Sequence, residues 1–312
     1  MKQQSALTWL VPIIAVLALF AAGIGLFYPN EGSSFSFTAV RGETVQLWGQ
    51  GWYRYDTPIG ALSFKAGDMI TLFLAIPVLV VSFILYRQGS MRGGLLLTGA
   101  LSYFLYTYLS LGFGATYNNL FIVYVLIFSA SLFGLILALT SFDVQALPAH
   151  FAETLPRRGI GIFLEVSGII LSLIWLVLSI LPALLQSKAP PEAYFYTTFM
   201  TGIVDIGIVA PALMIAGVLI LRRVPVGYLL ASTMLVFTCL LGPSLTAGGI
   251  IQIVEEVITV GQAMAFTVPF VILALIALGL TIRLFRSFSE TTPKMSKIKH
   301  KKAIRNERYS IS

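Results

Sequence analysis

Two acidic residues lie inside long apolar stretches, where an ionisable side chain costs free energy and needs a partner or a function. Asp205 lies in GIVDIGIVAPALMIAGV and Glu165 lies in GIFLEVSGII. If both stretches span a membrane, about 13 Å along its normal separate the two carboxylates, too far for a cooperating catalytic pair. Asp205 could bind a cation, a proton or a polar headgroup. Alternatively, it pairs with a loop cation such as Arg41 or Arg54, or caps a neighbouring helix.

A proline follows Asp205 within the same apolar stretch, at Pro211. Proline inside a helix removes one backbone hydrogen bond and leaves a carbonyl, here that of Gly207, without its usual partner. Broken helices of this kind occur in membranes only where the backbone faces protein or a water-filled cavity. The sequence therefore predicts a polar pocket beside Asp205, in the outer leaflet.

A second break is predicted at Pro243, in the segment GPSLTAGGIIQIVEE. Gly248 and Gly249 permit backbone conformations that other residues resist, so the chain could turn or re-enter the membrane here. The alternative is a continuous kinked helix that ends in a solvated acidic turn. Glu255 and Glu256 would lie at the same outer level as the pocket, which makes them further candidates for ligand binding.

Ser102, Tyr106 and Ser110 recur every four residues, which places them in one polar stripe on a helix. The turn after this helix contains Asn118. Such a stripe either holds neighbouring helices together through hydrogen bonds or lines a path for a solute. Tyr106 and Asn118 are therefore also candidates for ligand binding.

Residues that usually hold metals or redox cofactors are scarce. The single cysteine, Cys239, lies in an apolar run, and the two histidines are His150 in a polar loop and His300 near the C-terminus. No cysteine or histidine site for zinc, haem or an iron–sulfur cluster can be assembled within the apolar stretches. The sequence also lacks the phosphate-binding GxxxxGK[ST] motif and the HExxH motif. We expect no metal, no cofactor and no ATP-driven pumping by this chain.

The composition indicates which elements must position these residues. Apolar residues make up 57% of the 312, charged residues only 11%, and the mean hydropathy is +0.90. A soluble domain carries about a quarter of its residues as charged side chains, which excludes a soluble enzyme. The sequence predicts an all-α integral membrane protein, an eight-helix transmembrane bundle in which the end of the seventh span is least sharply defined. The expected spans are Leu7–Tyr28, Met69–Tyr86, Gly94–Gly114, Leu120–Phe142, Ile160–Leu185, Phe199–Leu221, Val226–Leu245 and Met264–Phe285.

Positively charged residues fall mainly on one side of these spans. Sixteen of the 20 Lys and Arg residues lie on the side of both termini, and four lie opposite. Because cytoplasmic loops of membrane proteins are enriched in Lys and Arg, both termini are expected in the cytoplasm. Residues 1–28 are interpreted as an uncleaved signal anchor, since their apolar run is longer than the core of a signal peptide.

A small extracytoplasmic cap is predicted over residues 29–68. Its segments SFSFTAV, ETVQLWG and GWYRYDT alternate in polarity or are aromatic, and glycines separate them, as is typical of a β-hairpin. About forty residues are too few for an independent core, so the cap should rest on the outer ends of the helices. Its aromatic side chains would form an interface belt or a ligand lid; they are Trp48, Trp52, Tyr53 and Tyr55.

Residues 69–286 are expected to form the other seven spans, and residues 287–312 a disordered, basic cytoplasmic tail. Seven Lys and Arg residues from Lys294 to Arg308 would be attracted to anionic lipid. Nucleic-acid binding is not expected, because the tail offers no aromatic platform for bases.

Three stretches, YFLYTY, FGATYNNLFIVYV and VDIGIVAPALMIAGVLILRRVPVGYLLA, resemble a group of bacterial multi-spanning membrane proteins with a similar YNxLF turn. That group also has an aspartate before PAL and paired arginines. The resemblance covers about residues 41 to 241. It implies a location in the bacterial inner membrane and marks Asp205 as a motif residue, but it implies no reaction.

These features favour a secondary transporter or permease for a small polar or cationic solute. Two matching four-helix halves, common in transporters, cannot be found in the sequence. One alternative is a membrane enzyme that acts on lipid or lipid-linked groups at the outer leaflet, with Asp205 and the two glutamates as acids or bases. The other is a non-catalytic accessory or sensor subunit that holds a second membrane protein.

Overall fold

The computed structural model describes residues 4–190, 193–196 and 198–290. Within these ranges, eight helices are long and apolar enough to cross a membrane, which is consistent with a multi-pass membrane protein and with the predicted number of spans. The predicted tail cations from Lys294 to Arg308 lie outside the described residues.

The first four spans form one side of the bundle. They are α1 (Leu7–Phe27), the pair α2 (Pro58–Ile70) and α3 (Ile76–Arg87), α4 (Met91–Gly114) and α5 (Phe121–Thr140). The last four are α6 (Arg157–Trp175) with α7 (Leu181–Leu185), α8 (Met200–Val204) with α9 (Ala210–Leu221), α10 (Pro225–Val254) and α11 (Val260–Arg286). A short 3-10 helix, η2 (Leu147–His150), lies between the two sets.

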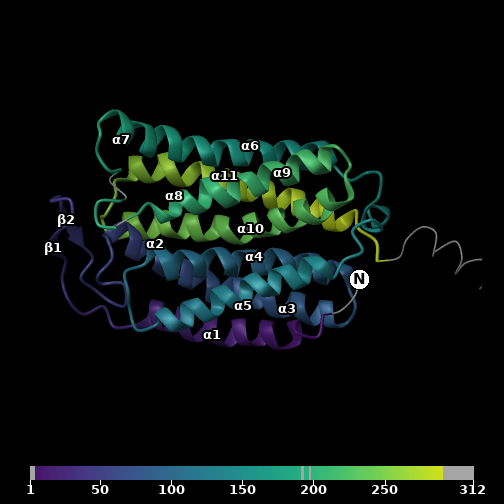
Figure 1. The fold of residues 1–312 in the computed structure, drawn as a ribbon, viewed down its shortest axis with the longest axis horizontal. Coiled ribbons are helices and arrows are strands. Elements are labelled where there is room, and N and C mark those ends of the chain that lie inside the picture. The colour runs from purple at the N-terminus through teal and green to yellow at the C-terminus, as the bar shows by residue number, and fades with distance from the viewer. Residues whose placement is uncertain (1–3, 191–192, 197, 291–312) are drawn as a thin grey trace, which may run out of the picture.

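Helix α10 joins the two sides, because it packs against α2 and α4 on one side and against α9 and α11 on the other (Figure 1). Strands β1 and β2 lie at one end of the bundle, which we call the cap end. The beginning of α1 lies at the opposite end, as Figure 1 shows.

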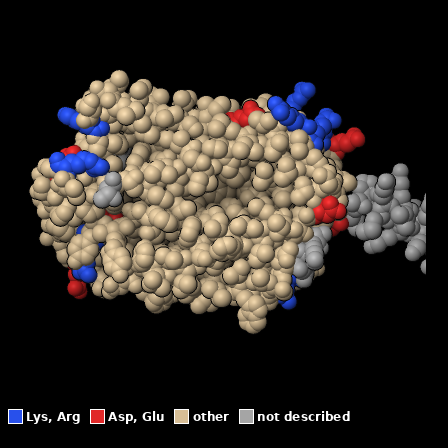
Figure 2. All heavy atoms as spheres, in the orientation of Figure 1, with Lys and Arg blue, Asp and Glu red and all other residues tan. Residues whose placement is uncertain are grey.

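On the face of the bundle drawn in Figure 2, charged side chains lie toward the ends and the middle of the surface is uncharged. Figure 2 shows Lys, Arg, Asp and Glu side chains toward the two ends of the visible face and none across its middle. Large apolar side chains are exposed between the ends, among them Val16, Phe73 and Leu278. Such a belt is favourable in hydrocarbon and unfavourable in water.

The cap contains the predicted hairpin. Strands β1 (Phe35–Thr38) and β2 (Thr44–Leu47) pair antiparallel, with Phe35 opposite Leu47. Gly49, with φ 76°, lies so close to the Ser33 carbonyl oxygen that a Cβ would approach it to 1.9 Å, so only glycine fits. The third predicted segment, GWYRYDT, forms turns and bends. In the described residues the sheet therefore consists of β1 and β2.

The cap is shorter than the predicted range 29–68, because α2 begins at Pro58 and not near Met69. Thr57 caps this helix by accepting a hydrogen bond from the backbone N–H of Gly60, and Pro58 occupies the first turn. Asp68, placed in the external loop by the sequence prediction, therefore lies inside a span.

The predicted break in the seventh span is absent, since α10 runs without interruption through Pro243, Gly248 and Gly249. A Cβ on Gly249 would lie 2.0 Å from the Thr267 hydroxyl oxygen, and one on Gly242 would lie 2.4 Å from the Ala274 Cβ. Both glycines thus let α10 and α11 approach closely, a use of small residues that is common between membrane helices.

Three spans contain a π-helical turn followed by a proline. A proline lacks the N–H group and clashes with the carbonyl one turn earlier, and widening that turn relieves the clash. The helix that carries Asp205 is therefore widened at the predicted break and not interrupted. The π-helical segments are η1 (Thr71–Ala75) before Pro77, η3 (Leu176–Ile180) before Pro182, and η5 (Asp205–Val209) before Pro211.

Residues 287–290 pair with the bundle, whereas the sequence prediction included them in the disordered tail. The backbone of Ser287 and Ser289 pairs with the loop around His150. The Glu290 carboxylate accepts hydrogen bonds from the Ser90 hydroxyl at 2.6 Å and from the Met91 N–H at 2.9 Å. A carboxylate at a helix N-terminus is favourable, so this contact fixes the end of α11 to the start of α4.

Candidate functional site

A cavity of about 850 Å³ lies inside the bundle, in the half nearer the cap. Its walls come from both sides of the molecule: α2 and α4 from the first four spans, and α6, the segment 198–209, α10 and α11 from the last four. Val45 and Gln46 of β2 also line it, so the cap contributes to the wall. This volume is in the range that proteins use for small organic ligands.

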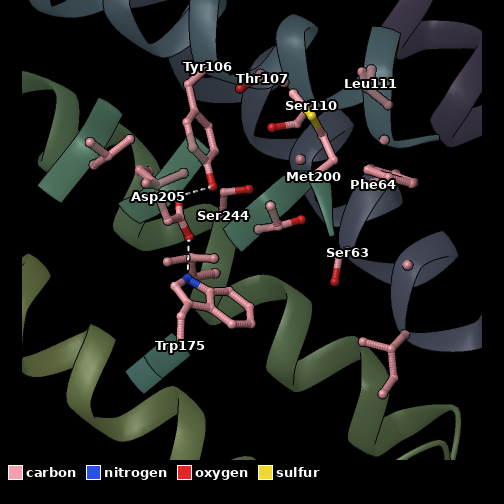
Figure 3. A pocket seen from close by; sticks show the side chains of 18 of the residues that line it. Ser63, Phe64, Tyr106, Thr107, Ser110, Leu111, Trp175, Met200, Asp205 and Ser244 are labelled. Atoms are coloured by element: carbon pink, nitrogen blue, oxygen red, sulfur yellow. Dashed lines mark hydrogen bonds between the residues drawn. The ribbon is translucent and has the colours of Figure 1, made fainter. Parts of the chain in front are cut away.

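Asp205 lies in the wall of this cavity and is 6% exposed. Its Oδ1 accepts a hydrogen bond from the Tyr106 hydroxyl at 3.1 Å, and its Oδ2 accepts one from the Trp175 Nε1–H at 2.8 Å (Figure 3). The three residues come from α4, α6 and the start of η5. Each carboxylate oxygen keeps a further lone pair for a ligand.

The loop cations that were considered as partners of Asp205 have other contacts. Arg41 donates to the backbone carbonyl of Ala193 at 3.1 Å, and the Arg54 guanidinium lies 5.3 Å from the centre of the Tyr55 ring. The partners of Asp205 are neutral donors, which stabilise a carboxylate without cancelling its charge. The site can therefore attract a cation.

Aromatic rings form much of the wall around Asp205. Trp175 meets Phe199 edge to face with 5.0 Å between ring centres, and Tyr106 meets Phe237 in the same way at 5.7 Å. Among the described lining residues there is no Lys or Arg. Aromatic faces beside a carboxylate are favourable for organic cations.

Two serine hydroxyls at this cavity have no hydrogen-bond partner in the described part of the chain. The Oγ atoms of Ser110 and Ser167 are buried and unpartnered, and both residues line the cavity. Ser167 as a residue is only 5% exposed. A buried polar group without a partner costs about 1 to 3 kcal/mol, so a ligand that bonds to these hydroxyls would recover that cost.

Another carboxylate, that of Asp56, lies where the cap meets the cavity. Its Oδ1 accepts hydrogen bonds from the Thr116 N–H at 2.8 Å and from the hydroxyl of Tyr196, a lining residue, at 3.0 Å. Burial raises the pKa of Asp56 to about 6, although the hydrogen bonds from Thr116 and Tyr196 oppose the shift. This carboxyl thus ties the cap to the turn after α4 and to the segment before α8.

Two of the four aromatic residues named in the cap, Trp52 and Tyr53, contact the helices. Trp52 donates from Nε1 to the Tyr124 hydroxyl at 3.3 Å and packs edge to face on Tyr28. Tyr53 is buried, whereas Tyr55 is 49% exposed. The contribution of β2 to the cavity wall fits the lid interpretation as well.

Of the predicted ligand-binding residues, Asp205 and Tyr106 meet at the cavity. The structure places Asn118 in the turn after α4, where its Oδ1 accepts from the Leu120 N–H at 3.0 Å. Glu255 and Glu256 are exposed at the end of α10. None of these last three is among the cavity-lining residues.

Glu165, the second acid predicted within a span, is half-buried on α6, where its Cγ packs against Gly217 of α9. It does not line the cavity. Close approach of α6 and α9 at this glycine accounts for its position.

Sequence reasoning missed Trp175 and Ser167 at the site, and it missed Asp68 as a buried acid. Trp175 and Ser167 lie in one apolar stretch without any motif, so only their contacts reveal them. A signal for Asp68 existed in the helix-start pair Thr57-Pro58, which extends the second span past it.

The chain was also compared with models of protein families, with curated proteins and with solved structures, and none of the three comparisons found a match.

Proposed function

We propose that this protein is a membrane carrier that binds a small, amphipathic organic cation in the cavity and moves it across the bilayer. The observation that carries this proposal is the buried Asp205 carboxylate, which faces a ligand-sized cavity with aromatic walls and has neutral partners only. Buried acids in membrane helices typically mark paths for substrates or ions.

The chemistry of the wall supports a solute with both polar and apolar parts. Asp205 would attract a protonated amine or quaternary ammonium group, and Trp175 and Phe237 would offer ring faces to it. The hydroxyls of Ser110 and Ser167 would bond to a polar substituent, because they have no partner among the described residues.

The construction of the helices supports movement. Walls from the first and last four spans enclose the cavity, so a shift between the two sides would change its access. The π-helical turns lie on three of the spans, and such turns frequently occur at functional sites. Carriers commonly rely on widened or broken helices beside the binding site.

The orientation that fits this proposal places the cap outside and both termini in the cytoplasm of a bacterial cell. The excess of Lys and Arg on the side of the termini supports it. The basic residues from Lys294 to Arg308 would then bind anionic lipid of the inner leaflet.

The test is ligand binding by the full chain in lipid nanodiscs, with a fluorescent aromatic cation such as ethidium as the probe. We expect Asp205→Asn to weaken binding by about 30-fold, or about 2 kcal/mol, because the change removes charge while it keeps shape. Glu165→Gln is the matched control, since it also neutralises an acid within a span but lies outside the cavity. Equal affinity of wild type and Asp205→Asn would contradict the proposal.

Native mass spectrometry of the same samples separates the other functions. A lipid retained at fixed stoichiometry by wild type, with no binding of the cation, would favour an enzyme that acts on lipid, since the apolar walls could hold an acyl chain. Co-purification of a second polypeptide with both forms equally would favour an accessory subunit.

A further inference from the structure

A second carboxylate is buried inside the bundle, away from the proposed solute site. Asp68 on α2 is 2% exposed, and its Oδ2 accepts a hydrogen bond from the Tyr53 hydroxyl of the cap at 2.7 Å. Gly67 lines the cavity, whereas Asp68 points away from it toward α1. The proposed binding of an organic cation makes no use of this group.

The surroundings of Asp68 contain hydroxyls and no cation among the described residues. The ionisable groups that interact with it are Tyr53 of the cap, Tyr103 and Tyr108 of α4 and Tyr124 of α5. Lys65, one turn earlier on α2, donates to Asn30 at the surface instead. A permanent charge in such a place would cost several kcal/mol.

The packing of α1 against Asp68 leaves little room on that side of the carboxyl group. Gly25 of α1 lies so close that a Cβ there would approach the Asp68 Oδ2 to 1.9 Å and the Tyr53 hydroxyl oxygen to 2.8 Å. A metal cation needs several oxygen ligands at distances above about 2 Å, and no space for such a shell exists on this side. A proton needs only one oxygen.

Hydroxyl groups lie between this region and the cavity. The Thr71 hydroxyl, one turn beyond Asp68 on the same span, lies 3.1 Å from the Tyr103 hydroxyl. The Tyr103 hydroxyl in turn lies near those of Thr107 and Ser244, which both line the cavity. A hydroxyl can accept one proton while it donates another, so such a chain can pass a proton and return to its starting state.

We infer that Asp68 is a proton-binding site and that Thr71 and Tyr103 link it to water in the cavity. The carboxylate takes up a proton to become a neutral acid and releases it again as the surroundings open. This inference builds on the proposed function in one respect: in a carrier, the proton at Asp68 would be the coupling ion that drives movement of the solute. The proton site itself needs no solute.

The first measurement is an infrared pH titration of the full chain in liposomes, following the carbonyl band of protonated carboxyl groups. Wild type should show a component that appears in acid, disappears in alkali and is missing in Asp68→Asn. Tyr53→Phe should retain this component at a changed frequency, because the carboxyl group loses its hydrogen-bond partner. If the spectra of wild type and Asp68→Asn do not differ at any pH, the inference is wrong.

Gly25→Ala and Gly23→Ala form a matched pair for the same experiment. A Cβ on Gly25 would overlap the carboxyl group, whereas one on Gly23 would meet nothing within 4 Å. Gly25→Ala should therefore change the titration of the Asp68 component, and Gly23→Ala should leave it as in wild type. An equal response of the two variants would contradict the packing that the inference depends on.

The second measurement is uptake of ethidium into liposomes under a pH gradient. Asp68→Asn should still bind the probe, but its accumulation ratio should fall about tenfold toward simple equilibration. Accumulation equal to wild type would overturn the coupling role while the carrier function stands. If wild type neither binds nor moves the probe but the Asp68 component still titrates, the proposed function fails and the proton site stands.

Discussion

Asp68 and Asp205 are the same chemical group in two different packing environments. Each lies within a long apolar span and close to a π-helical turn that precedes a proline. Asp205 faces a cavity of about 850 Å³, whereas Asp68 is buried, with Gly25 close to its carboxyl group and the Tyr53 hydroxyl bonded to it. The residue type therefore does not determine the role of a buried acid, because the volume beside it decides what can bind.

The hydrogen-bond donors to the two acids also come from different parts of the molecule. Asp205 accepts from Trp175 and Tyr106, which are themselves part of the cavity wall. Asp68 accepts from Tyr53, which belongs to the cap and not to a span. A movement of the cap would thus change the hydrogen bond of Asp68. A solute in the cavity would instead contact Asp205.

The largest expected effect comes from adding one methyl group beside Asp68. Gly25→Ala should destabilise the protein by about 3 kcal/mol, because its Cβ overlaps a buried carboxyl group that cannot move into open space. Gly23→Ala on the same helix meets nothing within 4 Å, and neither does Gly207→Ala, which is exposed two residues after Asp205. Both should be neutral or stabilise by up to about 1 kcal/mol.

Thermal unfolding in detergent, followed by circular dichroism, checks this ranking. A loss at Gly23→Ala or Gly207→Ala as large as that at Gly25→Ala would show that the Asp68 carboxyl group is not specially crowded. The contrast between an open and a closed site would then be wrong.

The next effect concerns Asp56, which lies between the two sites and outside the spans. Burial raises its pKa to about 6, so the folded state binds this proton more tightly than the unfolded chain does. The carboxyl group contributes stability that is complete below about pH 4 and is lost as the pH rises through about 6. The loss should be on the order of 2 to 3 kcal/mol.

Asp56→Asn isolates this contribution, because the amide oxygen can still accept from Thr116 and Tyr196. Relative to wild type, the variant should gain stability as the pH rises from about 4 to about 7, and the two should differ least in acid. The measurement is the unfolding midpoint of both proteins across that range. A constant difference between them would show that the Asp56 carboxyl keeps the same proton in the folded and unfolded states.

Removing one hydrogen-bond donor from each acid gives a smaller effect and compares the two sites directly. Tyr53→Phe should cost about 2 kcal/mol, since Tyr53 is the one described residue whose side chain donates to the Asp68 carboxyl group. Trp175→Phe should cost about 1 kcal/mol or less, because water in the cavity can replace the lost indole N–H. Chemical unfolding of both variants in detergent measures the two costs, and the reverse order would contradict the comparison.

The sequence allowed the architecture to be predicted better than the site. Length and hydropathy predicted eight apolar helices, and alternation with glycine predicted the hairpin of β1 and β2. These features depend on residues that are close in the chain. The boundary at Asp68 was wrong, because a hydropathy window ends at a charge even where the helix continues past it.

The site depends on contacts between distant segments, which a single sequence does not encode. Asp205 and Tyr106 could be identified because an acid and a polar stripe are unusual in apolar helices. Nothing in the sequence pairs either of them with Trp175, which meets them only through packing of α6 against α9. Likewise, Gly248 and Gly249 suggested a turn, although Gly249 instead lets α10 contact α11 closely.

The smallest expected effect concerns the serine hydroxyls. It tests whether the cavity beside Asp205 binds a ligand or is only poorly packed. Ser167 and Ser131 both have a buried hydroxyl without a partner, but only Ser167 lines the cavity. Neither replacement by alanine breaks a hydrogen bond of the described residues, so the two variants are compared by ligand binding. Ser167→Ala should weaken binding of a cation that carries a hydroxyl group by about threefold to tenfold, and Ser131→Ala should leave it unchanged.

Titration calorimetry with one such cation and its deoxy analogue makes the comparison within each variant. A hydroxyl preference that survives in Ser167→Ala would move recognition of the polar substituent to Ser110, the other unpartnered serine of this wall.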